Sequence, residues 1–186
     1  MLFRSGSKAH KLIEMVSANG GKPLGAMSPF LVQNMNMDLL NVKVGNWFKE
    51  NCAKVVESEG VIVSQKLGLA GTCDLIMEHK EHGLVMVDFK TQRIPAGKKH
   101  TAYPEWCWQL AAYSCTVSLP IERCLSVVIP TVPVGDLINH WWDDDDISQG
   151  YIIMTKLTEL WQMIHDYHPQ NVEMPPASSV VDVAHK

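Results

Sequence analysis

Two acidic residues and a lysine near the middle of the chain are spaced like the groups of a reactive site. Asp88 and Lys90 lie at the end of the apolar run 84–89, which has the composition of a buried strand. Because side chains alternate along a strand, Asp88 and Lys90 share one face and Phe89 points to the other. An acid and an amine lose solvation there unless they serve each other or a ligand. By itself, the pair is equally consistent with a surface salt bridge.

A further acid, Asp74, lies on the preceding apolar segment. The polar turn 78–83 joins the two segments into a predicted hairpin, in which Asp74 and Asp88 can meet on one face, depending on the register. Two carboxylates a few ångström apart repel each other, and a divalent cation is the usual remedy. Oxygen ligands favour Mg²⁺ or Mn²⁺ over zinc. A lysine beside such a metal can position a water molecule and neutralise charge on a phosphoryl group.

Other polar blocks accompany these residues, and each is ordinary by itself. His10 lies early in a predicted helix, with Glu14 one turn later, and Glu59 precedes a short strand. Gln109 and Tyr113 are spaced i, i+4 and therefore share one face of a later helix. A lone helical histidine is most often a surface or satisfied residue.

Taken together, the blocks resemble the RecB-like branch of the PD-(D/E)XK nuclease superfamily, which includes phage exonucleases and the mitochondrial genome maintenance exonuclease. The shared order is G-x-x-x-H, an acid before a strand, G-x-x-D, D-x-K-T and Q-x-x-x-Y, over about residues 5–130. The matching residues are Gly6, His10, Glu59, Gly71, Asp74, Asp88, Lys90, Thr91, Gln109 and Tyr113. Cys73 departs from the pattern, because it stands where the name of the motif has a proline.

The resemblance implies a role for each block. Asp74 and Asp88 would hold Mg²⁺ or Mn²⁺, and the backbone carbonyl of Phe89 and the His10 imidazole would complete the shell. Lys90 would contact the scissile phosphate or the attacking water, so the implied catalytic residues are Asp74, Asp88 and Lys90. The residues expected to support the site or to contact DNA are Glu59, Thr91, Gln109 and Tyr113.

The loop 92–105 concentrates basic residues although the whole chain has a net charge of −4 and a pI of about 6.0. The basic residues expected to hold phosphates are Arg93, Lys98 and Lys99. The alternative is a solvated, mobile loop. Trp106 and Trp108 follow, and their i, i+2 spacing predicts that they face different ways, so that at most one stacks a base. Core packing is the commoner fate of either ring.

Changes of hydrophobic period predict the elements that position these residues. We expect helices over about 5–16, 38–56, 106–117 and 147–168, and strands over 61–63, 69–77, 84–89 and 125–130. The acidic run 143–146 fits the start of the last helix, where the macrodipole favours negative charge. Three strands followed by a helical crossover to a fourth predict an α/β fold with a mixed central sheet flanked by helices. This order agrees with the restriction-endonuclease-like αβββαβ core of the superfamily, with extra N- and C-terminal helices.

Length and composition restrict the class of protein. The 186 residues predict one nuclease domain over 1–168 and a flexible tail over 169–186. Hydrophobic residues make up 46% and charged residues 19%, which excludes a disordered chain, and no apolar run is long enough to cross a membrane. Five cysteines without a C-x-x-C pair disfavour a disulfide scaffold, a zinc ribbon and an iron–sulfur nuclease. The N-terminus turns polar too soon for a signal peptide, so we expect a cytoplasmic protein, in the host cytoplasm if phage-encoded.

The sequence therefore predicts a Mg²⁺- or Mn²⁺-dependent deoxyribonuclease, an exonuclease of DNA replication, recombination or repair. The alternative is a non-catalytic nucleic-acid-binding domain that retains the fold. The presence of Asp74, Asp88 and Lys90 argues against this alternative, since a decayed site usually loses one of them. The choice between exonuclease and endonuclease stays open, as do cleavage polarity, DNA or RNA preference, strandedness, the number of metals and a missing N-terminal region. Assembly into a homo-oligomer or a larger replication or recombination complex is also open.

Overall fold

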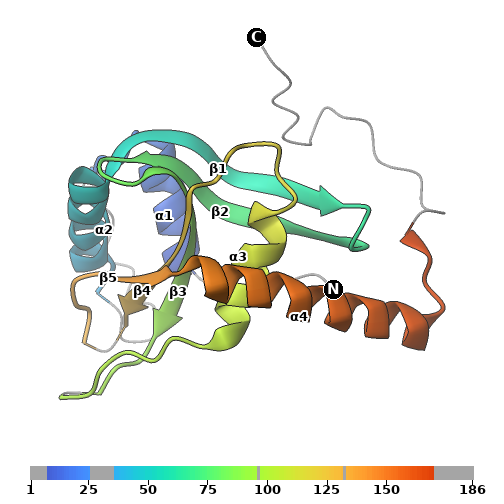
Figure 1. Ribbon diagram of the computed structural model, residues 1–186. Coiled ribbons are helices and arrows are strands. Elements are labelled where there is room, and N and C mark those ends of the chain that lie inside the picture. The colour runs from blue at the N-terminus through green and yellow to red at the C-terminus, as the bar shows by residue number, and fades with distance from the viewer. Residues whose placement is uncertain (1–7, 26–35, 96, 132, 170–186) are drawn as a thin grey trace, which may run out of the picture.

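The computed structural model describes residues 8–25, 36–95, 97–131 and 133–169 (Figure 1). Its elements, in chain order, are α1 (Lys8–Ala18), α2 (Met37–Asn51), β1 (Cys52–Ser64), β2 (Leu69–His79), β3 (Gly83–Gln92), α3 (Pro104–Ser114), β4 (Arg123–Pro130), β5 (Ile138–Trp142) and α4 (Asp144–His165). The strands form one sheet in the order β1-β2-β3-β4-β5. No helix in these ranges is both long and apolar enough to span a membrane.

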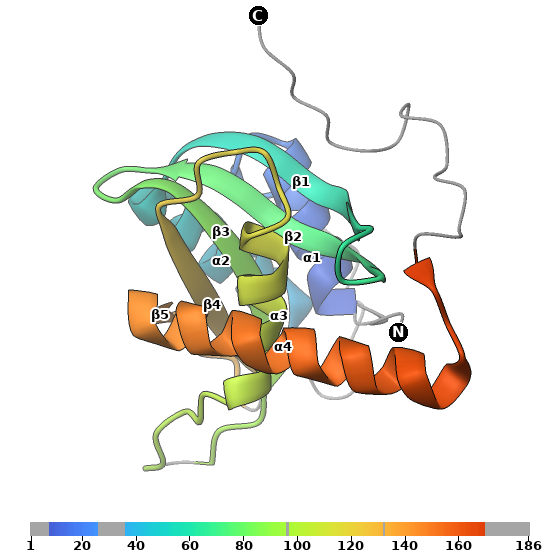
Figure 2. The same cartoon turned by 45° about the vertical axis from the view of Figure 1, so that its right-hand side comes forward.

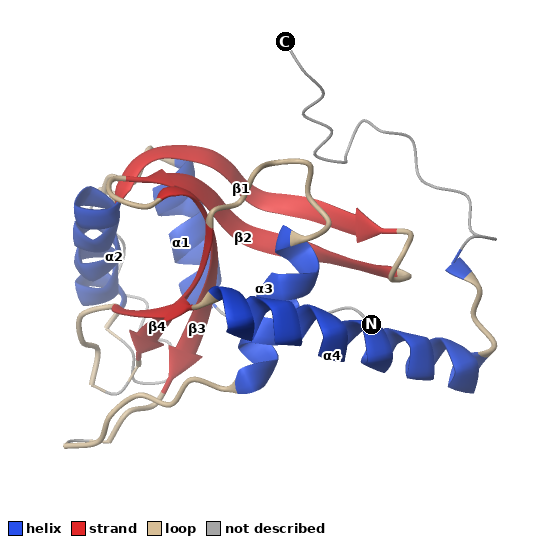
Figure 3. Ribbon diagram, in the orientation of Figure 1, coloured by secondary structure: helices blue, strands red, loops and turns tan. Residues whose placement is uncertain are grey.

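The sheet is mixed, as predicted. β3 pairs in parallel with β4, and the other three strand pairs are antiparallel. The parallel pair needs a crossover, which α3 supplies between β3 and β4. The predicted α/β fold with the restriction-endonuclease-like αβββαβ core is confirmed, and β5 adds a fifth strand at the edge beside β4. Helices α1 and α2 cover one face of the sheet, and α3 and α4 cover the other (Figures 2 and 3).

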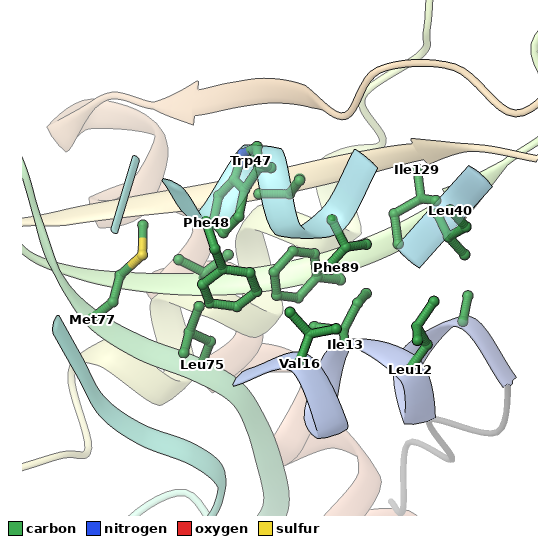
Figure 4. Close-up of a cluster of buried hydrophobic side chains, with 14 of the residues drawn as sticks. Leu12, Ile13, Val16, Leu40, Trp47, Phe48, Leu75, Met77, Phe89 and Ile129 are labelled. Atoms are coloured by element: carbon green, nitrogen blue, oxygen red, sulfur yellow. The ribbon is translucent and has the colours of Figure 1, made fainter. Parts of the chain in front are cut away.

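The face toward α1 and α2 carries the larger apolar core. Figure 4 shows Phe89 between the side chains of the two helices, close to Val16 and Phe48. The Trp47 ring packs edge-on against Phe89, with 5.4 Å between the ring centroids. Apolar side chains at alternate positions of β2, β3 and β4 complete this core, because alternation sends every second residue to the same face. They are Leu75, Met77, Val85, Val87, Phe89, Leu125, Val127 and Ile129.

Two element boundaries differ from the sequence prediction. The helix predicted over 38–56 ends at Asn51, and the strand predicted over 61–63 begins already at Cys52. The apolar spacing does continue past Asn51, but Val55 pairs with Met77 of β2, so strand pairing decides the conformation of this stretch. β1 is also irregular: its register with β2 shifts between Cys52 and Lys54 and again between Val55 and Glu57.

The chain after β4 also differs from the prediction. Residues 138–142 form β5, which the sequence did not predict, and pair with β4 from Cys124↔Trp142 to Val128↔Ile138. The prediction for the acidic run is confirmed. Asp143 caps α4 by accepting a hydrogen bond from the Asp146 backbone N–H at 2.8 Å, and the Asp146 side chain accepts one from Asp143 N–H.

Candidate active site

The β2–β3 hairpin brings the two predicted acids together. Leu75 pairs with Val87, and Asp74 and Asp88 are the next residues along the two strands. Both acids are buried, with exposed fractions of 8% for Asp74 and 7% for Asp88. The Asp74 carboxylate accepts a hydrogen bond from the Phe89 backbone N–H at 2.7 Å, which fixes its position against β3. The register that the sequence left open is therefore the one that joins the acids.

A chain of polar contacts runs from Asp88 to α3. Lys90 Nζ lies 2.7 Å from Asp88 Oδ2 and donates a hydrogen bond of 3.0 Å to Gln109 Oε1. Gln109 Nε2 in turn donates to the Tyr113 hydroxyl at 3.4 Å. Asp88 and Lys90 share the strand face that α3 covers, as the alternation predicts, so the helix restricts the rotamers available to the lysine.

Gly71 makes room for the end of this chain. A Cβ atom at residue 71 would lie 1.9 Å from the Tyr113 hydroxyl oxygen, so any larger residue would displace the ring. The first residue of the predicted G-x-x-D block therefore has a packing reason to be glycine. It lets Tyr113 lie against β2, close to Asp74.

Helix α1 places His10 next to Asp74 and the backbone of Phe89. His10 Nε2 lies 2.6 Å from the Phe89 carbonyl oxygen and 3.8 Å from Asp74 Oδ2. Asp74 and His10 thus both contact the backbone of Phe89, one at its N–H and the other at its carbonyl. The apolar Phe89 side chain anchors that backbone in the core on the opposite face.

Burial dominates the electrostatics of the acid pair. Loss of solvation, followed by repulsion from Asp88, raises the pKa of Asp74 to about 8. Burial also raises the pKa of Asp88, while the neighbouring Lys90 and His10 oppose that shift. Two buried carboxyl groups with raised pKa values, side by side, are typical of a functional site.

A third acid, Glu59, lies close to this pair, and Glu14 of α1 lies close to Glu59; only Glu59 was predicted as a site residue. Glu59 sits opposite Asp74 in the β1–β2 register, between the pairs Ser58↔Leu75 and Gly60↔Cys73, and has a left-handed φ of 54°. Such a φ is uncommon outside glycine and occurs often at functional sites. Burial and then repulsion from Glu14 raise the pKa of Glu59. The sequence signal for Glu14 was its i, i+4 spacing from His10.

Comparison with known families agrees with this geometry. Residues 32–120 match the family model of the PD-(D/E)XK nuclease superfamily. The chain is thus similar to this superfamily over a little less than half of its length. The matched range includes Asp74, Asp88, Lys90, Gln109 and Tyr113, whereas His10 lies before it.

Other comparisons add little to this family match. No curated protein matches the chain. A solved structure titled "Crystal structure of SSO0001" aligns with 20% sequence identity and a TM-score of 0.29, over 57% of this chain and 50% of that chain. The alignment thus spans about half the length of that protein.

The donor set around the acid pair fits a divalent cation. Asp88 Oδ2 is buried and, apart from its ion pair with Lys90, has no hydrogen-bond partner among the described residues. The His10 imidazole and the Phe89 carbonyl, which now contact each other, are further donors next to the two carboxylates. No three His, Cys, Asp or Glu side chains of the described ranges are arranged as a metal centre, so the predicted shell depends on the Phe89 carbonyl as well.

The other residues predicted to contact DNA are exposed. Thr91 is exposed on β3, and the predicted basic residues Arg93, Lys98 and Lys99 are exposed on the loop after it. Gln92 closes the base of this loop through two hydrogen bonds of 2.9 Å to the backbone of Thr101. The loop extends away from the sheet in Figure 1. Gly6 and the predicted tail from residue 170 lie outside the described residues.

Proposed function

We propose that this chain is a divalent-metal-dependent deoxyribonuclease that hydrolyses phosphodiester bonds. The observation that carries the proposal is the buried pair Asp74 and Asp88, joined on one strand face to a lysine that α3 holds in place. The nuclease superfamily domain over residues 32–120 supports a phosphodiester hydrolase. A structural salt bridge needs one acid and one base, and the second buried acid would only destabilise it.

In this proposal His10, Asp74, Asp88 and the Phe89 carbonyl hold Mg²⁺ or Mn²⁺. When bound, the ion would lower the pKa of a water molecule and neutralise charge on the phosphate. The Lys90 ammonium group lies beside the acid pair and offers a second positive charge to the scissile phosphate. Gln109 positions Lys90, and Tyr113 supports Gln109, so both act through the lysine.

We further propose that the enzyme is an exonuclease of the RecB-like branch. The basic loop that follows β3 supports this, because Arg93, Lys98 and Lys99 are exposed there and can bind the phosphates of a DNA strand. A cytoplasmic role in replication, recombination or repair, in the host cytoplasm if phage-encoded, is part of the proposal. So are residues 1–168 as one domain, and assembly into a homo-oligomer or a larger complex on DNA.

The test is a time course on end-labelled linear DNA and covalently closed circular DNA with Mg²⁺, Mn²⁺ or EDTA. We expect metal-dependent loss of the linear DNA, with the circles largely spared and no reaction in EDTA. Rapid cutting of closed circles would show an endonuclease and overturn only the mode of attack. Binding without hydrolysis under all metal conditions would favour the alternative, a non-catalytic nucleic-acid-binding domain.

A further inference from the structure

An apolar groove of about 530 Å³ lies between α3, the C-terminal half of α4 and the start of β2. Its walls are mainly aromatic and aliphatic side chains from the two helices. They are Trp106, Trp108, Leu157, Leu160, Trp161 and Ile164. The spacing of Trp106 and Trp108 predicted that they face different ways, yet both line this groove, because α4 packs across α3 and closes it (Figure 2).

The α4 wall of the groove is unusually exposed for an apolar surface. Its four residues follow the i, i+3, i+4, i+7 pattern of one helix face, and their exposed fractions are 45% for Leu157, 54% for Leu160, 37% for Trp161 and 68% for Ile164. The N-terminal half of the same helix packs closely on α3, where Gly150 meets Ala111. The apolar face therefore continues past the core that it would normally cover, which is typical of a binding surface.

The groove adjoins the candidate active site. Lys90, Gln109 and Tyr113 line the groove and also form the polar chain described above. A phosphate held at Lys90 would thus lie beside the aromatic wall of the groove. The groups attached to that phosphate on one side would enter the groove.

We propose that this groove binds unpaired nucleobases of a single-stranded nucleic acid whose backbone phosphate lies at Lys90. The inference rests on the proposed nuclease function and names its substrate class. Nucleobases are flat and stack on aromatic rings regardless of sequence, which suits a wall with three tryptophans. A duplex keeps the flat faces of its bases stacked inside, so it presents phosphates, sugars and base edges, none of which can stack on this wall. An apolar protein segment would leave Lys90 and Gln109 unexplained.

The test measures binding without metal, by fluorescence anisotropy in EDTA at fixed salt. The probes are a labelled twelve-nucleotide DNA strand, the same strand with its central six residues abasic, and a blunt duplex of that length. The abasic strand keeps every phosphate, so any difference reports the bases. We expect the intact strand to bind at least tenfold more tightly than either of the others.

Variants of one ring separate stacking from general packing. Trp161→Leu keeps an apolar residue and should remove most of the preference for the intact strand, whereas Trp161→Phe keeps a ring and should retain it. Trp141→Leu is the matched control, because Trp141 packs against His79 and His82 near the β2–β3 turn instead of the groove. A terminal 2-aminopurine should be quenched by the wild type and by Trp161→Phe, but not by Trp161→Leu.

Equal binding of intact and abasic strands, tighter binding of the duplex, or an unchanged preference in Trp161→Leu would overturn the inference. So would a change in sedimentation of Trp161→Leu with no change in DNA binding, which would indicate that a second copy of the chain covers the groove. The two proposals fail separately. Hydrolysis with no base preference would leave only the nuclease, and a base preference with no hydrolysis in Mg²⁺ or Mn²⁺ would leave only the groove.

Discussion

The two faces of β3 have opposite chemistry although alternate residues of one short strand form them. On the face toward α1 and α2, Val85, Val87 and Phe89 are fully buried in an apolar core. On the face toward α3, Asp88 and Lys90 are charged groups removed from most of the solvent. Burial of apolar surface stabilises the fold, whereas burial of a carboxylate costs stability. The apolar face therefore supplies stability that offsets the cost of burying the charged face.

The two faces are also mechanically linked at Phe89. Its ring is held by Trp47 on the apolar face, while its backbone N–H and carbonyl contact Asp74 and His10 at the site. The comparison implies that substitutions on the apolar face change stability, whereas those on the polar face change activity with little loss of stability.

The largest expected effect is on activity from the polar face. Asp88→Asn and Lys90→Ala should each lower the rate of DNA hydrolysis about 10²–10⁴-fold, since each removes charge stabilisation worth roughly 3–5 kcal/mol in the transition state. Circular dichroism should show folded proteins in both cases. Rates within threefold of the wild type in either purified variant would remove that residue from the site.

Substitutions on the apolar face should lower stability and leave activity nearly unchanged. Leu125→Ala lies on β4 beside Val87 and empties part of the core, so it should lower the free energy of unfolding by about 2–5 kcal/mol. Denaturant titration measures this loss. Hydrolysis per folded molecule should stay close to the wild type, and a large loss of activity in the folded variant would show that the faces are not separable.

The third prediction concerns pH and the absence of metal. The pKa of Asp74 is raised to about 8 in the folded protein, whereas an unfolded aspartate titrates near 4. Between these values unfolding releases a proton, so the stability of the protein in EDTA should fall as the pH rises from about 4 to 8. Asp74→Asn cannot ionise but can still accept the Phe89 hydrogen bond. The free energy of unfolding of Asp74→Asn should therefore exceed that of the wild type by about 1–4 kcal/mol at pH 8.

Denaturant titrations at pH 5 and pH 8 check this prediction. The gap between Asp74→Asn and the wild type should nearly close at pH 5, where the wild-type carboxyl group is protonated. A gap of equal size at both pH values would mean that the charge of Asp74 is not what costs stability.

The smallest expected effect tests the packing of Gly71 against Tyr113. Gly71→Ala places a Cβ atom against the tyrosine hydroxyl and should cost about 1–3 kcal/mol of stability. Adding Tyr113→Phe should recover part of the loss, because it removes the nearest atom. Gly25→Ala is the control, since open space surrounds Gly25. An equal loss from both glycine variants would show an effect of the backbone alone.

The hairpin was predictable because its signals are local. The alternation on either side of the turn 78–83 predicted two strands, but the register that places Asp74 opposite Asp88 came only from the structure. Residues 52–57 and β5 were not predictable in this way. The first stretch continues a helical apolar spacing, and β5 is a short strand whose pairing with β4 supplies its conformation.

Sequence patterns also could not predict the parts of the site that depend on contacts between residues far apart in the chain. No spacing relates His10 to the Phe89 carbonyl, 79 residues further along the chain, and only the resemblance to a nuclease family pointed to it. The aromatic groove depends on α4 crossing α3 at Gly150, which brings Trp161 to the same cavity as Trp106. Helix crossing angles and contact points are set by tertiary packing, which periodicity alone does not encode.

The irregular course of β1 has a consequence for how copies of this protein behave at high concentration. β1 is an edge strand of thirteen residues that pairs only with β2 in the sheet. An intact edge of that length would be a template for strands from other molecules, and so a starting point for aggregation. The two register shifts and the left-handed Glu59 interrupt the row of backbone donors and acceptors at three places. The geometry that brings Glu59 beside the buried acids thereby also protects the sheet against edge-to-edge association.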